Sequence, residues 1–250
     1  MSRRKKTKPR VIKQIVIKAD SPIFDAGDIV LKGVTPMDAL DHKNLCQSGV
    51  NYLGDYLGWA VDAHNWSLKQ HITWLSRHMK ISQPYESYGA FHNDRLVGFF
   101  NYSAGTSFLT TQICYYVDRH MAGKGIAKEA LETLVQKAFY LKGFEAVELH
   151  IDVENIASQK VATRAGFEAV QNYKCSRSGT KGSGHMQLWV KINPYATSGI
   201  NLEQYRNESF DYLAPAYLNY AVAIEVINTL KTLSEELKGY LAGTGFIPKR

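Results

Sequence analysis

Strand-like and helix-like segments alternate across the middle of the chain, and this alternation restricts the possible folds more than any other feature. The run "QICYYVD" (112–118) is rich in β-branched and aromatic residues. A helix is predicted next, because apolar residues recur at helical spacing at Ile126, Ala130, Leu134, Ala138 and Leu141. "AVELHIDV" (146–153) then alternates between apolar and polar residues, and a second helix is predicted over 156–165. This order predicts an α/β sheet with helices on both faces.

Two further helices are predicted nearer the N-terminus. Thr35 followed by Pro36 is a typical helix start, and Ser67 has the same position before "LKQHITWLSRHM" (68–79). The second helix has three apolar residues at helical spacing, which we expect to form its buried face: Ile72, Leu75 and Met79.

Short β-rich runs flank these helices. "VIKQIVIKA" (11–19) and "DIVLKGV" (28–34) predict strands, and "SYGAFHNDRLVGFFNYSA" (87–104) predicts a hairpin that turns at Asn93-Asp94. "EAVQNYKC" and "HMQLWVKI" predict a second hairpin, joined by the polar loop 176–184.

The positive charge of the chain is concentrated at its N-terminus. The formal net charge is +7, and residues 1–20 hold eight lysines and arginines and one aspartate, so this segment carries all of it. A basic tail can contact RNA, DNA or a ribosome through phosphate groups. The alternative is a solvated, disordered terminus.

The composition agrees with a cytoplasmic protein without a membrane segment. The chain is 45% hydrophobic, yet no run approaches the roughly 18 apolar residues of a membrane span. The start "MSRRKKTKPR" lacks the apolar part of a secretory signal. The chain has three cysteines, Cys46, Cys114 and Cys175. Their number is odd and their spacing is not that of a metal site, so we expect free thiols and no metal ion.

The pattern changes after Pro194. Over 217–241 apolar residues recur at steps of four and three: Leu218, Val222, Val226, Leu230, Leu233, Leu237 and Leu241. Such an amphipathic helix packs against a partner, here either its own domain or a second subunit in a homodimer. We therefore divide the chain into a tail (1–20), an α/β domain (21–194) and a helical extension (195–250).

Gly123 and Gly125 stand where the strand 112–118 meets the helix that begins at Ile126. Glycine lets backbone N–H groups approach a ligand, and a helix start adds unpaired N–H groups that favour phosphate. A P-loop is excluded because Ile126 follows Gly125, and a dinucleotide fingerprint is excluded because Lys128 stands where its third glycine belongs. Two glycines alone also fit a tight turn without a ligand.

Three linked motifs resemble the Gcn5-related N-acetyltransferase (GNAT) family, over roughly residues 28–193. They are "QICYYVD", "AGKGIAKEAL" and "ELHIDVENIASQKVATRAGFEAV". Asn155, Ser158 and Gly166-Phe167 resemble a signature of the Rim-type branch, which acetylates protein N-termini. "NYLGDYLGWAVDAHNWSLKQHITWL" resembles the tryptophan-bearing helical segment of that branch. The resemblance implies a GNAT-like central mixed, splayed β-sheet, acetyl-CoA as cofactor, and an amine-bearing acceptor, either a protein N-terminus or a small molecule.

The resemblance also implies a coenzyme site. Backbone N–H groups of the loop would hold the pyrophosphate, from Met121, Ala122, Gly123, Lys124, Gly125, Ile126 and Ala127. The backbone of Ile113 and Tyr115 would pair with the pantetheine arm, and Asn155 would hydrogen-bond its amide. Ala122 departs from the arginine or glutamine of the family pattern. Lys124 and Lys128 either add positive charge or are solvated.

Acetyl transfer to an amine needs a neutral nucleophile, a stabilised oxyanion and a protonated leaving thiolate. The resemblance assigns the thiolate proton to Ser158; the alternative is a surface hydroxyl bonded to its own backbone. Gln112 stands where many relatives have glutamate, and it cannot accept a proton. Glu148, His150 and Asp152 share one strand face. His150, which can change charge near neutral pH, is the first candidate base and Glu148 the second; otherwise this face is bonded to loops.

Two other functions stay open on the sequence alone. One is a nucleic-acid- or ribosome-associated GNAT-fold protein that binds or modifies its target through the basic tail. The other is a non-catalytic acyl-CoA-binding module, which Gln112 supports. We expect acceptor specificity to depend on residues 47–80 and the loop 176–184.

Overall fold

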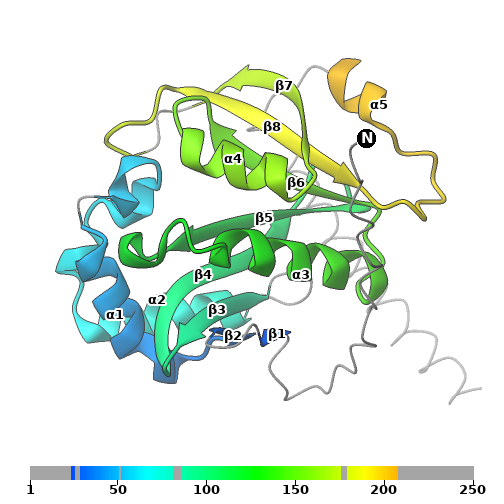
Figure 1. Ribbon diagram of the computed structural model, residues 1–250. Helices are drawn as coiled ribbons and strands as arrows, with labels where there is room; N and C mark the ends of the chain where they lie inside the picture. Colours follow the sequence, from blue (N-terminus) through cyan, green and yellow to red (C-terminus); the bar gives the residue numbers. More distant parts are fainter. Residues whose placement is uncertain (1–23, 26–28, 51, 81–85, 176–178, 208–250) are drawn as a thin grey trace, which may run out of the picture.

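The computed structural model describes residues 24–207 apart from 26–28, 51, 81–85 and 176–178. The basic tail, the predicted strand 11–19 and the amphipathic helix 217–241 lie outside the described residues. Within them, eight strands form one mixed sheet in the order β1-β2-β3-β4-β5-β6-β8-β7 (Figure 1). None of the helices in this part of the chain is long and apolar enough to cross a membrane.

The strands follow the predicted segments closely. They are β1 (Phe24–Asp25), β2 (Ile29–Gly33), β3 (Ser87–His92), β4 (Arg95–Ala104), β5 (Thr110–Val117), β6 (Ala146–Asp152), β7 (Glu168–Lys174) and β8 (His185–Ile192). Both predicted hairpins are confirmed, as β3–β4 and β7–β8. All neighbouring pairs are antiparallel except β5 and β6. These two are parallel because a helical crossover joins them.

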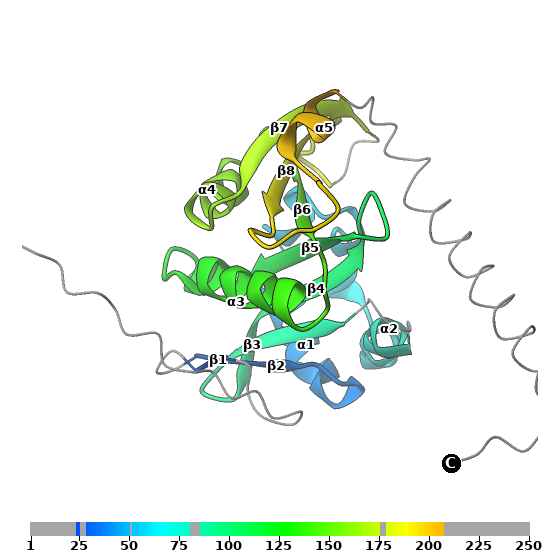
Figure 2. The same ribbon diagram turned by 90° about the vertical axis from the view of Figure 1, so that its right-hand side faces the viewer.

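Helices cover both faces of the sheet, as predicted. Figure 2 shows α3 (Ile126–Tyr140) and α4 (Ile156–Arg164) on one side, with α1 (Ala39–Ser48) and α2 (Leu68–Lys80) on the other. The short helix α5 (Leu202–Asn207) packs beside β7. Short 3-10 helices complete the chain: η1 (Pro36–Asp38), η2 (Leu53–Asp55), η3 (Gly58–Ala60), η4 (Ala63–Asn65) and η5 (Arg119–Met121).

The larger core cluster lies between the sheet and α3 with α4. Four of the five apolar residues predicted to face inward from α3 are buried: Ile126, Ala130, Leu134 and Ala138. The fifth, Leu141, is 57% exposed. The helix ends at Tyr140, so Leu141 lies at its C-cap and leaves the buried face.

The helices on the other face begin as predicted, but one buried face differs. The Thr35 side chain accepts a hydrogen bond from the Met37 N–H and caps the turn that leads into α1. On α2, Leu75 is buried as expected, whereas Ile72 is 39% exposed. His71 is buried instead, because its ring nitrogen bonds His42 of α1. The Met79 side chain lies outside the described residues.

The chain beyond Pro194 continues to pack on the α/β core. The Glu145 carboxylate accepts hydrogen bonds from the backbone N–H groups of Thr197 and Ser198, at 3.0 and 3.1 Å. Tyr205 of α5 is buried and donates a hydrogen bond to Glu148 Oε1 at 3.1 Å. The part of the predicted extension that the structure describes is therefore attached to β6 and β7.

Candidate active site

The sheet opens between β5 and β6. These strands pair only at Thr110, Thr111 and Gln112, which face residues 146–148. The rest of β5 stays paired with β4 up to Val117 but has no partner strand on the β6 side in the described sheet. The predicted splay is present, and it exposes one backbone edge of β5 beside the start of α4 (Figure 1).

The glycine loop lies at the end of that edge. Gly123 and Gly125 have φ of +78° and +90°, a conformation that strongly favours glycine. Gly125 is the N-cap of α3, and it has no side chain that could accept a hydrogen bond from the first turn. The first N–H groups of α3 lack intrahelical partners. They therefore remain available to an anionic ligand, at the positive end of the helix dipole.

A cleft of about 540 Å³ lies where the loop, the open edge of β5 and the start of α4 meet. Most residues predicted to hold the coenzyme line it: Tyr115, Met121, Ala122, Gly123, Gly125, Ile126, Ala127, Asn155 and Ser158. Ile113 and Lys124 are not among the lining residues. Ile113 is buried in the core beneath β5, and the Lys124 ammonium contacts Met121 Sδ at 3.3 Å.

Ser158 is joined to a tyrosine across the cleft. The Tyr115 hydroxyl lies 2.8 Å from Ser158 Oγ, while the Ser158 N–H donates to Asn155 Oδ1 at 3.1 Å and so caps α4. Burial raises the pKa of Tyr115 to about 12, although the hydrogen bond to Ser158 opposes this effect. Tyr115 therefore keeps its proton at neutral pH. The family resemblance implied only a backbone role for this residue.

The two predicted bases are held elsewhere. Glu148 is fully buried, and its carboxylate accepts hydrogen bonds from the Thr106 N–H at 3.0 Å and from Tyr205. His150 Nδ1 lies 2.6 Å from the Tyr173 hydroxyl. Neither lines the cleft, since their side chains are hydrogen-bonded to Thr106, Tyr173 and Tyr205. The structure thus shows the alternative arrangement, a polar strand face bonded to its surroundings.

The remaining polar strand residues also have structural partners. Asp152, on the same face, accepts hydrogen bonds from the backbone N–H groups of Glu154 and Ser183, at 2.9 and 2.8 Å. The Gln112 amide contacts Cys114 Sγ at 3.2 Å. Neither residue lines the cleft.

One wall of the cleft comes from the helical segment before β3. Tyr52, Leu53, Tyr56 and Leu57 line it. The Tyr56 hydroxyl donates a hydrogen bond to the Glu154 carbonyl at 3.0 Å. The loop before β8 contacts the same segment, since the Thr180 N–H donates to the Gly54 carbonyl and the Lys181 ammonium lies 2.9 Å from Asp55. The two segments expected to determine acceptor specificity therefore meet.

Sequence reasoning missed part of the basic side of the cleft. Lys160 and Arg164 of α4, which it did not name, line the cleft together with Lys128 of α3, which it did. On a helix, residues 157, 160, 161 and 164 share one face, and all four line the cleft. Extending that helical periodicity from the Asn155 cap would have identified them.

Comparison with known proteins agrees with this arrangement. The family model described as the acetyltransferase (GNAT) domain matches residues 29–168. A search of curated proteins finds no significant match.

Solved structures share the fold at low identity. RimL, a ribosomal L7/L12 alpha-N-protein acetyltransferase in complex with coenzyme A, is 16% identical with a TM-score of 0.63, over 69% of this chain and 98% of that one. The microcin C7 self-immunity acetyltransferase MccE, in complex with acetyl-CoA and AMP, is 16% identical with a TM-score of 0.62, over 70% and 98%. The ribosomal-protein-S5-alanine acetyltransferase from Vibrio fischeri is 18% identical with a TM-score of 0.60, over 70% and 98%. Because the family model spans more than half of the sequence and the opened sheet carries the matching glycine loop, the chain belongs to the GNAT acetyltransferase family.

Proposed function

We propose that the protein is an acetyl-CoA-dependent N-acetyltransferase that acts on a primary amine, with a protein N-terminus as the favoured acceptor. The observation that carries the proposal is the open edge of β5 between the glycine loop and the Ser158–Tyr115 pair. The acceptor preference is supported by two of the structural neighbours, which are acetyltransferases of ribosomal proteins.

The cleft suits the coenzyme in shape and charge. Its volume of about 540 Å³ is in the range of ordinary small-molecule sites. A Cβ built on Gly123 meets no atom within 4 Å, and one on Gly125 meets only Glu129 Oε1, at 3.7 Å. The loop therefore leaves an open cradle for the pyrophosphate. Lys128, which also pairs with Glu132, and the basic residues of α4 add positive charge for phosphate groups.

The thioester of acetyl-CoA supplies the activated acyl group. This chain positions the coenzyme and the amine, and it moves protons between them. Backbone N–H groups on the open edge of β5 can stabilise an oxyanion, and an extended ligand can add to such an edge as a strand does. The Ser158 and Tyr115 hydroxyls, which are hydrogen-bonded to each other, donate a proton to the leaving sulfur. Among the described residues that line the cleft, Glu154 alone has a carboxylate, so it is the side chain there that accepts the proton of the amine.

The test follows release of free coenzyme A when acetyl-CoA is mixed with peptides bearing different N-terminal residues or with small amines. We expect Ser158→Ala and Tyr115→Phe to reduce kcat by about 100-fold or more, the usual contribution of a general acid. Thr163→Ala is the matched control, because it lies on α4 but is exposed and does not line the cleft. Coenzyme binding without turnover of any amine would make the protein an acyl-CoA-binding module instead.

A further inference from the structure

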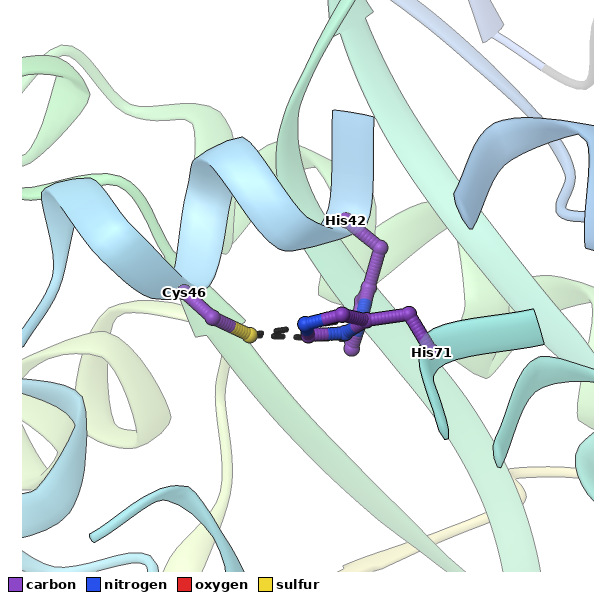
Figure 3. A group of neighbouring side chains, drawn as sticks. All are labelled: His42, Cys46 and His71. Atoms are coloured by element: carbon purple, nitrogen blue, oxygen red, sulfur yellow. Dashed lines mark hydrogen bonds between the residues drawn. The ribbon is translucent and has the colours of Figure 1, made fainter. Parts of the chain in front are cut away.

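Two histidines and a cysteine meet in the buried layer between the sheet and the helices α1 and α2. His42 and Cys46 are one turn apart on α1, and His71 reaches them from α2 (Figure 3). Their exposed fractions are 0, 2 and 0%. One ligand-type atom from each residue, a ring nitrogen or the sulfur, lies within 4.8 Å of the others.

The hydrogen bonding of this cluster is incomplete. His42 Nδ1 and His71 Nδ1 lie 2.8 Å apart, so one of them donates a proton to the other. His42 Nε2 lies 2.8 Å from the Tyr116 hydroxyl. His71 Nε2 is buried and has no hydrogen-bond partner among the described residues. Buried polar atoms are nearly always satisfied, so this nitrogen is an exception within the described core.

The surroundings exclude a reactive thiol. Cys46 Sγ lies 4.0 Å from both ring nitrogens of His42, whose ring stacks on Trp74 at 4.7 Å between centroids. Burial raises the pKa of the Cys46 thiol to about 12. Reactive cysteines are partly exposed and lie near positive charge, and Cys46 is neither exposed nor next to lysine or arginine in these contacts.

We propose that His42, Cys46 and His71 bind a metal ion with a filled d shell, Zn²⁺ or Cu⁺. Imidazole and thiolate are ligands that both ions prefer. Bond lengths of about 2.0–2.3 Å place the ligand atoms of a tetrahedral site about 3.3–3.6 Å apart. The separation between His42 Nδ1 and His71 Nδ1, 2.8 Å, and that between Cys46 Sγ and His42 Nδ1, 4.0 Å, differ from these values by about half an ångström. All the ligand atoms lie within 4.8 Å of one another. The proposal does not depend on the acetyltransferase function.

Each proton of the cluster has a destination when the ion binds. In the tautomer where His42 Nε2–H donates to Tyr116, His71 Nδ1–H donates to His42 Nδ1. When both Nδ1 atoms bind the metal, this proton moves to His71 Nε2, the nitrogen that has no partner. The Cys46 thiol loses its proton to solvent, so one proton is released for each ion bound. The hydrogen bond to Tyr116 then orients His42, as outer groups commonly do for metal-bound histidine.

The two ions would leave different charges in the layer. One thiolate and two neutral imidazoles make a neutral site with Cu⁺ and a site of charge +1 with Zn²⁺. A buried charge is costly without a partner, and zinc also needs a fourth ligand. The separate arms of the experiment decide between the ions.

The test uses the full chain without a metal-binding tag, stripped by a chelator. Co²⁺, a spectroscopic probe for zinc sites, is expected to produce thiolate charge-transfer absorption and the visible bands of a tetrahedral site, saturating at one ion per chain. Competition with a coloured Cu⁺ chelator under reducing conditions forms the second arm. Cys46→Ala should abolish binding in both arms, and Cys175→Ala, which alters another cysteine that forms no disulfide, should not. Tyr116→Phe should weaken binding by about 10- to 100-fold.

Circular dichroism checks that each variant folds. If a variant does not fold, the metal titrations of the wild type still test the proposal. Binding of either ion at one equivalent that is lost in Cys46→Ala supports the site and identifies the ion. The proposal is wrong if the wild type binds neither Co²⁺ nor Cu⁺, or if the cobalt spectrum persists in a folded Cys46→Ala protein. The cluster would then be a hydrogen-bonded part of the core.

Discussion

Replacing Gly125 with tryptophan separates the binding role of the glycine loop from its structural role. Gly125 has φ of +90° and lines the cleft, so the substitution has two effects. It places an L-residue in a left-handed conformation, which costs about 1–2 kcal/mol of folding free energy. It also fills the proposed pyrophosphate cradle with an indole ring, and we expect this to weaken acetyl-CoA binding at least 100-fold.

The expected size of each effect follows from binding to the native state alone. Acetyl-CoA at 100 times its Kd stabilises the wild type by about 2.7 kcal/mol. For a folded unit of this size, each kcal/mol raises Tm by about 2–4 °C, so the shift is about 5–11 °C. After a 100-fold loss of affinity, the same coenzyme concentration gives about 0.4 kcal/mol and a shift of about 1–2 °C.

Gly143→Trp is the matched control for this experiment. Gly143 also has a positive φ, +73°, and has no atom within 4 Å of a built Cβ, but it does not line the cleft. Both variants should lose Tm without ligand, and only Gly143→Trp should keep the full coenzyme shift. Differential scanning fluorimetry measures both quantities. Equal coenzyme shifts in the wild type and Gly125→Trp would refute the placement of the site.

Three further predictions concern other parts of the chain. Burial opposes ionisation of Glu86, but hydrogen bonds from Lys142, Tyr88 and Lys137 outweigh it and lower the pKa of Glu86 to about 2. Glu86→Gln should therefore destabilise the fold by at most about 3 kcal/mol at pH 7. This difference in urea unfolding should shrink as pH falls from about 4.5 towards 2, and a constant difference would contradict it. Deletion of residues 1–10 should leave coenzyme binding and activity on a small amine unchanged; loss restricted to a ribosomal substrate would identify a docking arm. If the predicted helix 217–241 joins a homodimer, replacing Leu230 and Leu237 with aspartate should yield folded monomers in light scattering, and a monomeric wild type would rule the dimer out.

Local periodicity predicted most of the fold. The helix after Gly125 and the alternating strand after it need only spacing to be recognised, because both elements bury one side of a regular pattern. The exception on α2 is instructive. Ile72 has the hydrophobicity of a core residue, but the position beside His42 is taken by His71. A polar contact between two helices, which no local pattern encodes, determined which side faces inward.

The site was predictable where it is local and not where distant segments meet. The glycine loop, Asn155 and Ser158 lie in contiguous motifs, so the sequence identified them as candidate site residues, although it did not predict that Asn155 caps α4. Contact of Tyr115 with Ser158 depends on how β5 and α4 pack. The polar strand face was recognised, yet its burial depends on Tyr205 of α5, which contacts Glu148 from beyond the resembling region. Only the tertiary arrangement removes Glu148 and His150 from the cleft.

The short pairing between β5 and β6 also has a mechanical consequence. Three residue pairs join the strand group β1–β5 to the group β6, β8 and β7, whereas seven join β4 to β5. Since it has fewer than half as many pairs, the line between the two groups should yield more easily than the pairing of β4 with β5. A molecule bound along the open edge would add backbone hydrogen bonds to that line. We therefore expect occupancy of the cleft to stiffen the whole protein, so that the relative motion of the two halves reports on the ligand.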